Sequence, residues 1–375
     1  MTVRVSKPAF NLREKLSELD KPSGIKGNEL LRSETTQEVR DLISAGRRNM
    51  VINGSFLIDQ RNAGSELSIT GNSLFSADRW THNNDAFTYY KTQRKNDADI
   101  ATIGTEYYLR ATITTATSVG SNQSHQIENN LEGYTVKHLN LGTQGAKQCT
   151  LSFWVRCSIT GLFGGSLQNS AYNRCHPFSY TVDTADTWEH KTFTFNTYGF
   201  TTGSFNTAEG VGLRLVFSLG NGNSRQGSTD RWHTSVIGFA PTGETRLVET
   251  NGATLDIAQV QLELGTTATE FEHRPYAEEL ALCQRYYWKL DDGSNQAGAQ
   301  WLYVIGDGGN MQYRRATVNH PVPMRGSPSV TNISLTNNGS TVGVQFNGNH
   351  TTTIYANGIG GGITEVTYAE FNVEL

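Results

Sequence analysis

Aromatic side chains with polar neighbours are the residues of this sequence best suited to chemistry. Trp232 lies between Arg231 and His233 in a polar stretch. A sugar is held when its apolar face stacks on a Trp or Tyr ring and polar side chains bond its hydroxyls. The pattern predicts glycan stacking, with packing between subunits as the alternative. The same interpretation applies to three rings of the C-terminal part, Trp288, Trp301 and Tyr303.

Two other tryptophans fit a structural role better. Trp80 and Trp154 are interpreted as sandwich core or as packing residues, because Trp is highly buried on average.

Catalytic motifs are absent from the sequence. It has no GxSxG elbow, no HExxH pair, no GxxxxGK[ST] loop and no clustered Asp-x-Asp calcium loop. Paired carboxylates about 5–10 Å apart could serve a glycosidase. The candidates, Glu263 with Glu270 and Asp291 with Asp292, fall in polar faces or loops and are interpreted as solvated surface. We therefore predict no catalytic residue, no cofactor and no enzyme.

Metal and disulfide chemistry also lack a signature. The nine histidines are scattered without the close paired spacing of many metal ligands, so no metal site is predicted. A threefold axis would still bring three copies of one histidine together. The four cysteines form no CxxC pair and are predicted to be reduced and buried: Cys149, Cys157, Cys175 and Cys283.

Composition favours many short strands. Hydrophobic residues make up 36% of the chain and charged residues 18%, and the chain contains 38 glycines. Long amphipathic helices are typically richer in Ala, Leu, Glu and Lys than this composition, which therefore favours short strands. A net charge of −4 without long runs of one sign favours neither nucleic acid nor an anionic membrane. No stretch of about 18 apolar residues and no signal peptide is present, which predicts a soluble protein made in a cytoplasm, without membrane insertion.

Residues 1–47 carry two short helical patterns in a polar stretch. Asn11 can cap the first, and Thr35-Thr-Gln-Glu38 reads as a capping box for the second. Neither is long enough to be stable alone in water, so each is expected to dock onto partner chains or another protein. A floppy tail is the alternative. The candidate docking residues are apolar: Phe10, Leu12, Leu16, Leu19, Val39, Leu42 and Ile43.

Period-two alternation dominates residues 48–275. In Leu151–Arg156, Leu151, Phe153 and Val155 alternate with polar residues and Trp154. In Asp256–Leu264, one apolar face is predicted to hold Ala258, Val260, Leu262 and Leu264. Strands with one face on a core and one in water show this pattern. It predicts a jelly-roll β-sandwich built of two antiparallel sheets.

The C-terminal part begins with a helical signal. Tyr276, Leu280, Cys283 and Tyr287 recur at helical spacing, which predicts a connecting helix over residues 276–288. Strand and turn patterns fill residues 289–375 and predict a small β tip domain. The predicted organisation is therefore mainly β: an N-terminal helical or extended segment (1–47), a sandwich (48–275), a short helix (276–288) and the tip (289–375).

Several motifs resemble fibre or appendage proteins of tailed bacteriophages. Arg47–Phe56 with Ala77–Trp80 resembles the opening of a widespread phage fibre domain, and Gln261–Tyr287 resembles its closing strand and exit helix. The opening and closing strands are also similar to carbohydrate-binding modules of jelly-roll type. Pro321–Pro328 resembles the start of a fibre tip, and Lys7–Gly46 is similar to leaders of marine cyanobacterial phage fibres.

This resemblance implies a homotrimer in a virion assembled in the cytoplasm of a bacterial host. Its N-terminus would grip another virion protein of the tail, neck or capsid, and its distal β-domains would meet a host-surface glycan. A purely structural head, neck or tail decoration fibre is the alternative hypothesis. A glycan hydrolase is the third.

Overall fold

A computed structural model describes residues 47–85, 89–197, 201–291, 314–335, 342–356 and 366–375. The seven candidate docking residues of the N-terminal segment lie outside this part of the chain. Residues from Asn49 to Leu375 form one compact unit. That unit contains two separate large hydrophobic cores, one between two large sheets and one in the C-terminal part.

The first large sheet has six strands in the order β1-β4-β5-β14-β7-β10, all neighbours antiparallel. Its centre is β14 between β5 and β7. The strands span β1 (Leu67–Ser68), β4 (Tyr90–Lys95), β5 (Tyr108–Ile113), β7 (Cys149–Cys157), β10 (Glu189–Phe195) and β14 (Thr254–Leu264).

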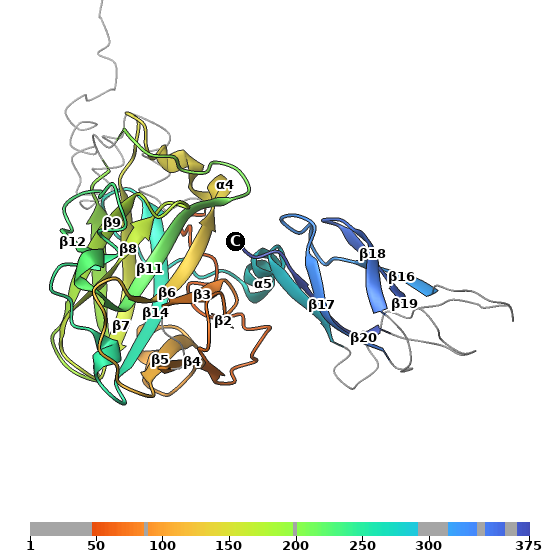
Figure 1. Cartoon of the computed structure of the whole chain (residues 1–375), viewed down its shortest axis with the longest axis horizontal. Helices are drawn as coiled ribbons and strands as arrows, with labels where there is room; N and C mark the ends of the chain where they lie inside the picture. The colour runs from red at the N-terminus through yellow and green to blue at the C-terminus, as the bar shows by residue number, and fades with distance from the viewer. Residues whose placement is uncertain (1–46, 86–88, 198–200, 292–313, 336–341, 357–365) are drawn as a thin grey trace, which may run out of the picture. The chain divides into compact units, whose positions relative to one another are not determined.

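The second large sheet also has six strands, in the order β2-β3-β6-β11-β8-β9, and is antiparallel throughout. Figure 1 shows the two sheets facing one another as the layers of a sandwich. The strands span β2 (Phe75–Ala77), β3 (Trp80–Asn84), β6 (Ser124–Glu132), β8 (Gly161–Gln168), β9 (Cys175–Val182) and β11 (Val211–Asn221).

Interlocking aromatic rings fill the space between the sheets. Phe153 from the first sheet contacts Phe217 and Phe178 from the second, with ring centroids 5.0 and 6.1 Å apart. Trp80 is fully buried in the same core and donates from Nε1 to Asn53 O at 2.9 Å. The predicted β-sandwich of jelly-roll type is therefore confirmed, as are the core positions of Trp80, Leu151, Phe153 and Val155.

A β-bulge in β14 breaks the predicted alternation. The pairing of β14 with β7 shifts between Ala258 and Gln261, and Gln259 has φ of +46°. One extra residue in a strand moves every later side chain to the other face. Val260 and Leu262 point into the core as predicted, but Ala258 does not. The prediction for Ala258 was wrong, since it packs outside the sandwich with Ile100 and Tyr108.

Short elements connect the large sheets. A two-stranded parallel pair forms from β12 (Gln226–Gly227) and β13 (Ala240–Pro241). The helical turns are α4 (Gly133–Val136), η1 (Ile100–Ile103), η2 (Lys137–Leu139), η3 (Asn223–Arg225) and η4 (Leu247–Glu249). No helix of the described residues has the length and apolar character needed to cross a bilayer.

The predicted connecting helix is shorter than expected. Helix α5 (Tyr276–Gln284) ends four residues before Trp288, and Tyr287 already belongs to strand β15. Tyr287 adopts strand rather than helix conformation because it pairs with Asn372 of β20. Of the helical stripe, Cys283 and Tyr287 are buried, but Tyr276 is 59% exposed.

The C-terminal core lies between two three-stranded antiparallel sheets. Their orders are β15-β20-β17 and β16-β19-β18. The strands span β15 (Tyr287–Asp291), β16 (Arg314–Asn319), β17 (Ser329–Leu335), β18 (Val342–Asn347), β19 (Thr351–Ala356) and β20 (Val366–Asn372). The strand character predicted for this part of the chain is confirmed, and its division into domains stays a prediction.

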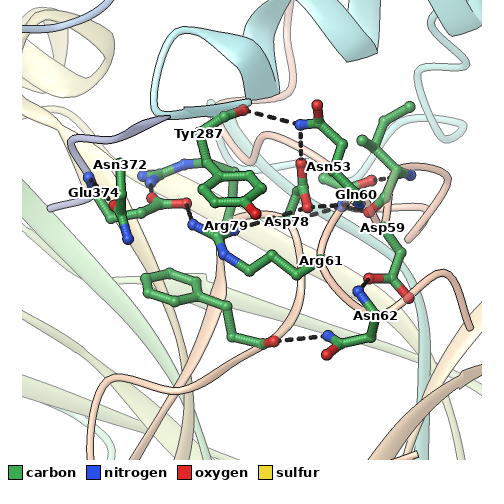
Figure 2. Close-up of polar contacts among 12 residues, drawn as sticks. Asn53, Asp59, Gln60, Arg61, Asn62, Asp78, Arg79, Tyr287, Asn372 and Glu374 are labelled. Atoms are coloured by element: carbon green, nitrogen blue, oxygen red, sulfur yellow. Dashed lines mark hydrogen bonds and ion pairs between the residues drawn. The ribbon is translucent and has the colours of Figure 1, made fainter. Parts of the chain in front are cut away.

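Buried arginines tie the residues after β20 to the sandwich, as Figure 2 shows. Arg79, in the β2–β3 turn, forms an ion pair with Glu374 and lies 3.6 Å from the centroid of the Tyr286 ring. Arg61 bonds the same carboxylate at 3.1 Å and lies 3.5 Å from the Tyr287 ring centroid. We call Arg61, Arg79 and Glu374 the arginine clasp.

Neutralising Glu374 tests the arginine clasp. The Arg79 side chain is 1% exposed and that of Glu374 is 7% exposed. Because Glu374→Gln leaves a buried guanidinium without its counter-charge, we expect the free energy of unfolding to fall by roughly 3 kcal/mol. Chemical denaturation measures this. The matched control is Asp183→Asn, whose carboxylate is 73% exposed beside Lys191. Equal denaturation midpoints for the two variants would show that the clasp does not stabilise the fold.

A buried carboxylate makes stability depend on pH. Burial raises the pKa of Glu244 from 4.5 to about 7, although its side chain accepts a hydrogen bond from Asn221 N at 2.6 Å. The folded state therefore holds this proton more tightly than the unfolded chain does. The resulting stabilisation is complete below pH 4.5 and is lost as the pH rises through 7.

Glu244→Gln removes this titration. We expect the wild-type protein to lose roughly 3 kcal/mol between pH 4.5 and 8 on account of Glu244. Denaturation midpoints across that range should fall less steeply for Glu244→Gln than for the wild type. Glu66→Gln, at a half-exposed surface ion pair with Lys91, should keep the wild-type slope. An unchanged slope for Glu244→Gln would contradict the assignment.

Candidate functional site

An open groove of about 540 Å³ lies on the outer face of the first sheet. Its floor comes from adjacent strands β7 and β10, where Trp154 pairs with His190. Since Leu151, Phe153 and Val155 face the core, the alternation sends Ser152 and Trp154 outward. The local sequence of β7 thus fixes both the core and the groove floor.

Two aromatic rings make the floor of this groove. The rings of Trp154 and His190 lie 5.2 Å apart at 53°. Trp154 is half-buried, which leaves part of its ring open to the groove. The β14 bulge brings Gln259 to the same place, where its Nε2 donates to Ile103 O at 3.0 Å and to Gly104 O at 3.2 Å. A bulge beside a site typically redirects a side chain in this way.

The segment from Ala268 to His273 forms the wall of the groove. Its anchor is Glu263, a buried carboxylate that accepts from Thr269 N at 2.8 Å and Thr269 Oγ1 at 2.6 Å. The interpretation of Glu263 as solvated surface was wrong, because it fixes this loop. Glu270, Phe271 and His273 follow Thr269 and line the groove.

The groove carries little positive charge. Neither Lys nor Arg is among its lining residues within the described chain. The nearby Arg156 is paired with Asp256 at 2.8 Å and with Asp97 at 3.0 Å. Burial lowers the pKa of His190, which keeps that imidazole neutral near pH 7. The site therefore offers an aromatic floor with neutral polar groups and one carboxylate, Glu270.

The rings predicted to stack on a sugar lie elsewhere. Trp232 is 7% exposed and packs against His176 and Phe205, with ring centroids 5.4 and 5.5 Å away. Trp288 is also 7% exposed and is stacked on Phe371 at 4.4 Å. Their prediction as exposed platforms was wrong, since both rings are used in packing. Trp301 and Tyr303 lie outside the described residues.

Trp154 was the ring that sequence reasoning missed as part of the groove. It was predicted to lie in the sandwich core or to serve in packing. The core position is wrong, since Trp154 lies on the outer face of β7, but its half-buried ring does pack against the small cluster of Ile100, Tyr108 and Ala258. The signal was the alternation itself, which put Trp154 on the polar face. Gln259 had the same signal, because the alternation that put Val260 and Leu262 on the apolar face put Gln259 on the polar one, although the bulge itself is invisible in the hydrophobic pattern.

The described residues offer little for other chemistry. None of their His, Cys, Asp and Glu side chains gather in threes as a metal site would need. The four cysteines are buried and unbridged, which confirms the prediction of free thiols. Glu270 is the one carboxylate among the described groove residues, whereas a glycosidase would need two.

No protein-family model matches the sequence, and no curated protein does either. Among solved structures, the chain is similar to the enzymatically active domain of tailspike protein 4 of bacteriophage CBA120, with 11% identity and a TM-score of 0.32. That match covers 58% of this chain and 21% of the tailspike chain, so the chain spans about a fifth of its length.

Two carbohydrate-binding modules show a similar degree of likeness. One is TmCBM61, solved in complex with beta-1,4-galactotriose, with 12% identity, a TM-score of 0.28 and coverage of 58% of this chain and 100% of the module. The other is the family 11 module of the cellulase Lic26A-Cel5E of Clostridium thermocellum, with 10% identity, a TM-score of 0.28 and coverage of 56% and 99%. At these TM-scores the likenesses carry no argument about function.

Proposed function

We propose that this protein is a virion appendage of a tailed bacteriophage that binds a host-surface glycan in the groove over β7 and β10. The observation that carries the glycan assignment is the outward Trp154–His190 pair on the groove floor. A ring there receives the apolar face of a sugar. Ser152, Gln259 and Glu270 supply polar groups along its edge for the hydroxyls.

The charge of the groove narrows the ligand class. With Glu270 and no Lys or Arg in the described lining, an anionic sugar would meet no counter-charge. Neutral hexoses fit better, because they need only stacking and hydrogen bonds. The groove volume of about 540 Å³ is suited to a short oligosaccharide rather than one ring.

The virion part of the proposal rests on the resemblance of the sequence motifs to phage fibres. Residues 1–47 would hold the particle, and three chains would assemble into one fibre. Weak single contacts with a sugar would then suffice, because several linked sites raise the avidity steeply. A decoration fibre without receptor binding is the alternative, and it predicts no role for the groove.

Truncating Trp154 tests the sugar site directly. We expect Trp154→Ala to weaken binding of a neutral oligosaccharide at least tenfold, since the stacking surface is lost. Binding to an array of neutral glycans, followed by calorimetric titration of the best ligand, measures this. The matched control is Tyr134→Ala. It removes an aromatic ring that is 49% exposed and does not line the groove. Equal affinities of the two variants would remove the groove from the proposal.

Competition for host cells tests the biological role. The full chain, purified and mixed with host cells before phage is added, is expected to bind them and slow adsorption. Trp154→Ala should compete less well, and Tyr134→Ala should match the wild type. If the wild-type protein neither binds cells nor competes, the structural decoration fibre is the better assignment.

A further inference from the structure

A second, smaller pocket of about 230 Å³ lies on the outer side of the other large sheet, where β3 ends and β6 begins. Its lining combines apolar and polar groups: Asn83, Asp85, Ser124, Tyr172, Arg225 and Phe239. The core separates this sheet from the one that carries the groove, so the two hollows share no residue. Whatever this pocket binds, it binds independently of the groove.

Two rings supply the apolar part of the pocket. Tyr172 and Phe239 have ring centroids 5.9 Å apart. Tyr172 is held in place by Arg214, whose guanidinium lies 4.0 Å from the ring centroid and bonds Asn169 O at 2.9 Å. The wall is therefore preorganised for a small ligand with an apolar face.

Arg225 supplies a positive charge that forms no ion pair within the described chain. Its Nε donates to Asn122 O at 3.1 Å, which fixes the side chain. Among the described residues no carboxylate forms an ion pair with Arg225 within 4.0 Å. The two terminal nitrogens keep their N–H groups for another acceptor. A planar guanidinium with free donors matches the geometry of a carboxylate.

Ser124, which is 3% exposed, lies at the edge of the pocket. Beside it, Asp85 accepts from Ser124 N at 2.8 Å and is thereby fixed as an acceptor. Asn83 completes a set of groups suited to ligand hydroxyls.

We propose that this pocket binds one acidic sugar residue of the uronate class. Its carboxylate would pair with Arg225, its ring would lie against Tyr172 and Phe239, and its hydroxyls would bond Asp85. The volume of about 230 Å³ suits a single ring. This inference goes beyond the groove proposed for neutral glycans. One face of the sandwich would bind a neutral sugar and the other face an acidic one.

Titration of the full chain with glucuronate and galacturonate, followed by ligand-observed NMR, tests the proposal. We expect saturable binding, at least tenfold tighter than that of glucose, galactose or acetate. Arg225→Gln should weaken uronate binding at least tenfold, because the charge-assisted bonds are lost. Arg231→Gln is the matched control, since Arg231 is a 70% exposed arginine outside the lining.

The outcomes separate this site from the groove. Trp154→Ala should leave uronate binding unchanged, and Arg225→Gln should leave neutral oligosaccharide binding unchanged. Acetate binding as tight as that of the uronates would reduce the pocket to a simple anion site and overturn the proposal. Equal affinity for neutral and acidic monosaccharides, or no effect of Arg225→Gln, would overturn it as well. Circular dichroism of each variant confirms that the fold is retained.

Discussion

The alternation of side chains along the two packed sheets is the constraint on which the rest of the structure depends. Phe153 and Phe217 interlock across the core at 5.0 Å, and this contact needs both strands to keep their inward faces. Every neighbour of an inward residue must then point outward. Trp154 reaches the groove for that reason, and Arg214 reaches Tyr172 because Leu213 and Leu215 are in the core. The same strands therefore set both the packing of the core and the position of the groove floor.

The β14 bulge is the one place in that strand where the constraint is relaxed. Leu255 and Ile257 precede it in the core, and Val260 and Leu262 follow it in the core. The extra residue lets Gln259 adopt φ of +46° and turn toward Ile103 and Gly104. A regular strand in register with Val260 and Leu262 would have sent Ala258 inward and Leu255 and Ile257 outward. The bulge instead keeps apolar residues in the core on both sides of it.

The sequence allowed the sandwich to be predicted because its signal is local. Alternation over Cys149–Cys157 can be read without knowing what lies opposite. The locations of Trp232 and Trp288 depend on distant partners, such as His176 and Phe371, which no local pattern reveals. The polar flanks Arg231 and His233 suggested exposure, yet His233 exchanges backbone hydrogen bonds with Cys175 and draws its neighbour inward. Trp154 could have been predicted to face outward. Its position on the polar face of the alternation is a stronger indication than the general tendency of Trp to be buried.

Most of the buried arginines in this fold form internal ion pairs, and these differ from an arginine that is open to a ligand. Arg79 and Arg61 share Glu374, and Arg110 and Arg156 share Asp256, each carboxylate being almost fully buried. A buried ion pair has a large desolvation cost. Such ion pairs therefore fix a particular arrangement of segments more than they add net stability. Against that background Arg225 differs, because it is held by a backbone carbonyl and faces a hollow without a partner carboxylate in the described chain. Its guanidinium lies 5.2 Å from the Phe239 ring centroid but forms no ion pair with a described carboxylate. A cation without an internal counter-charge is a reason to look for its partner in a ligand.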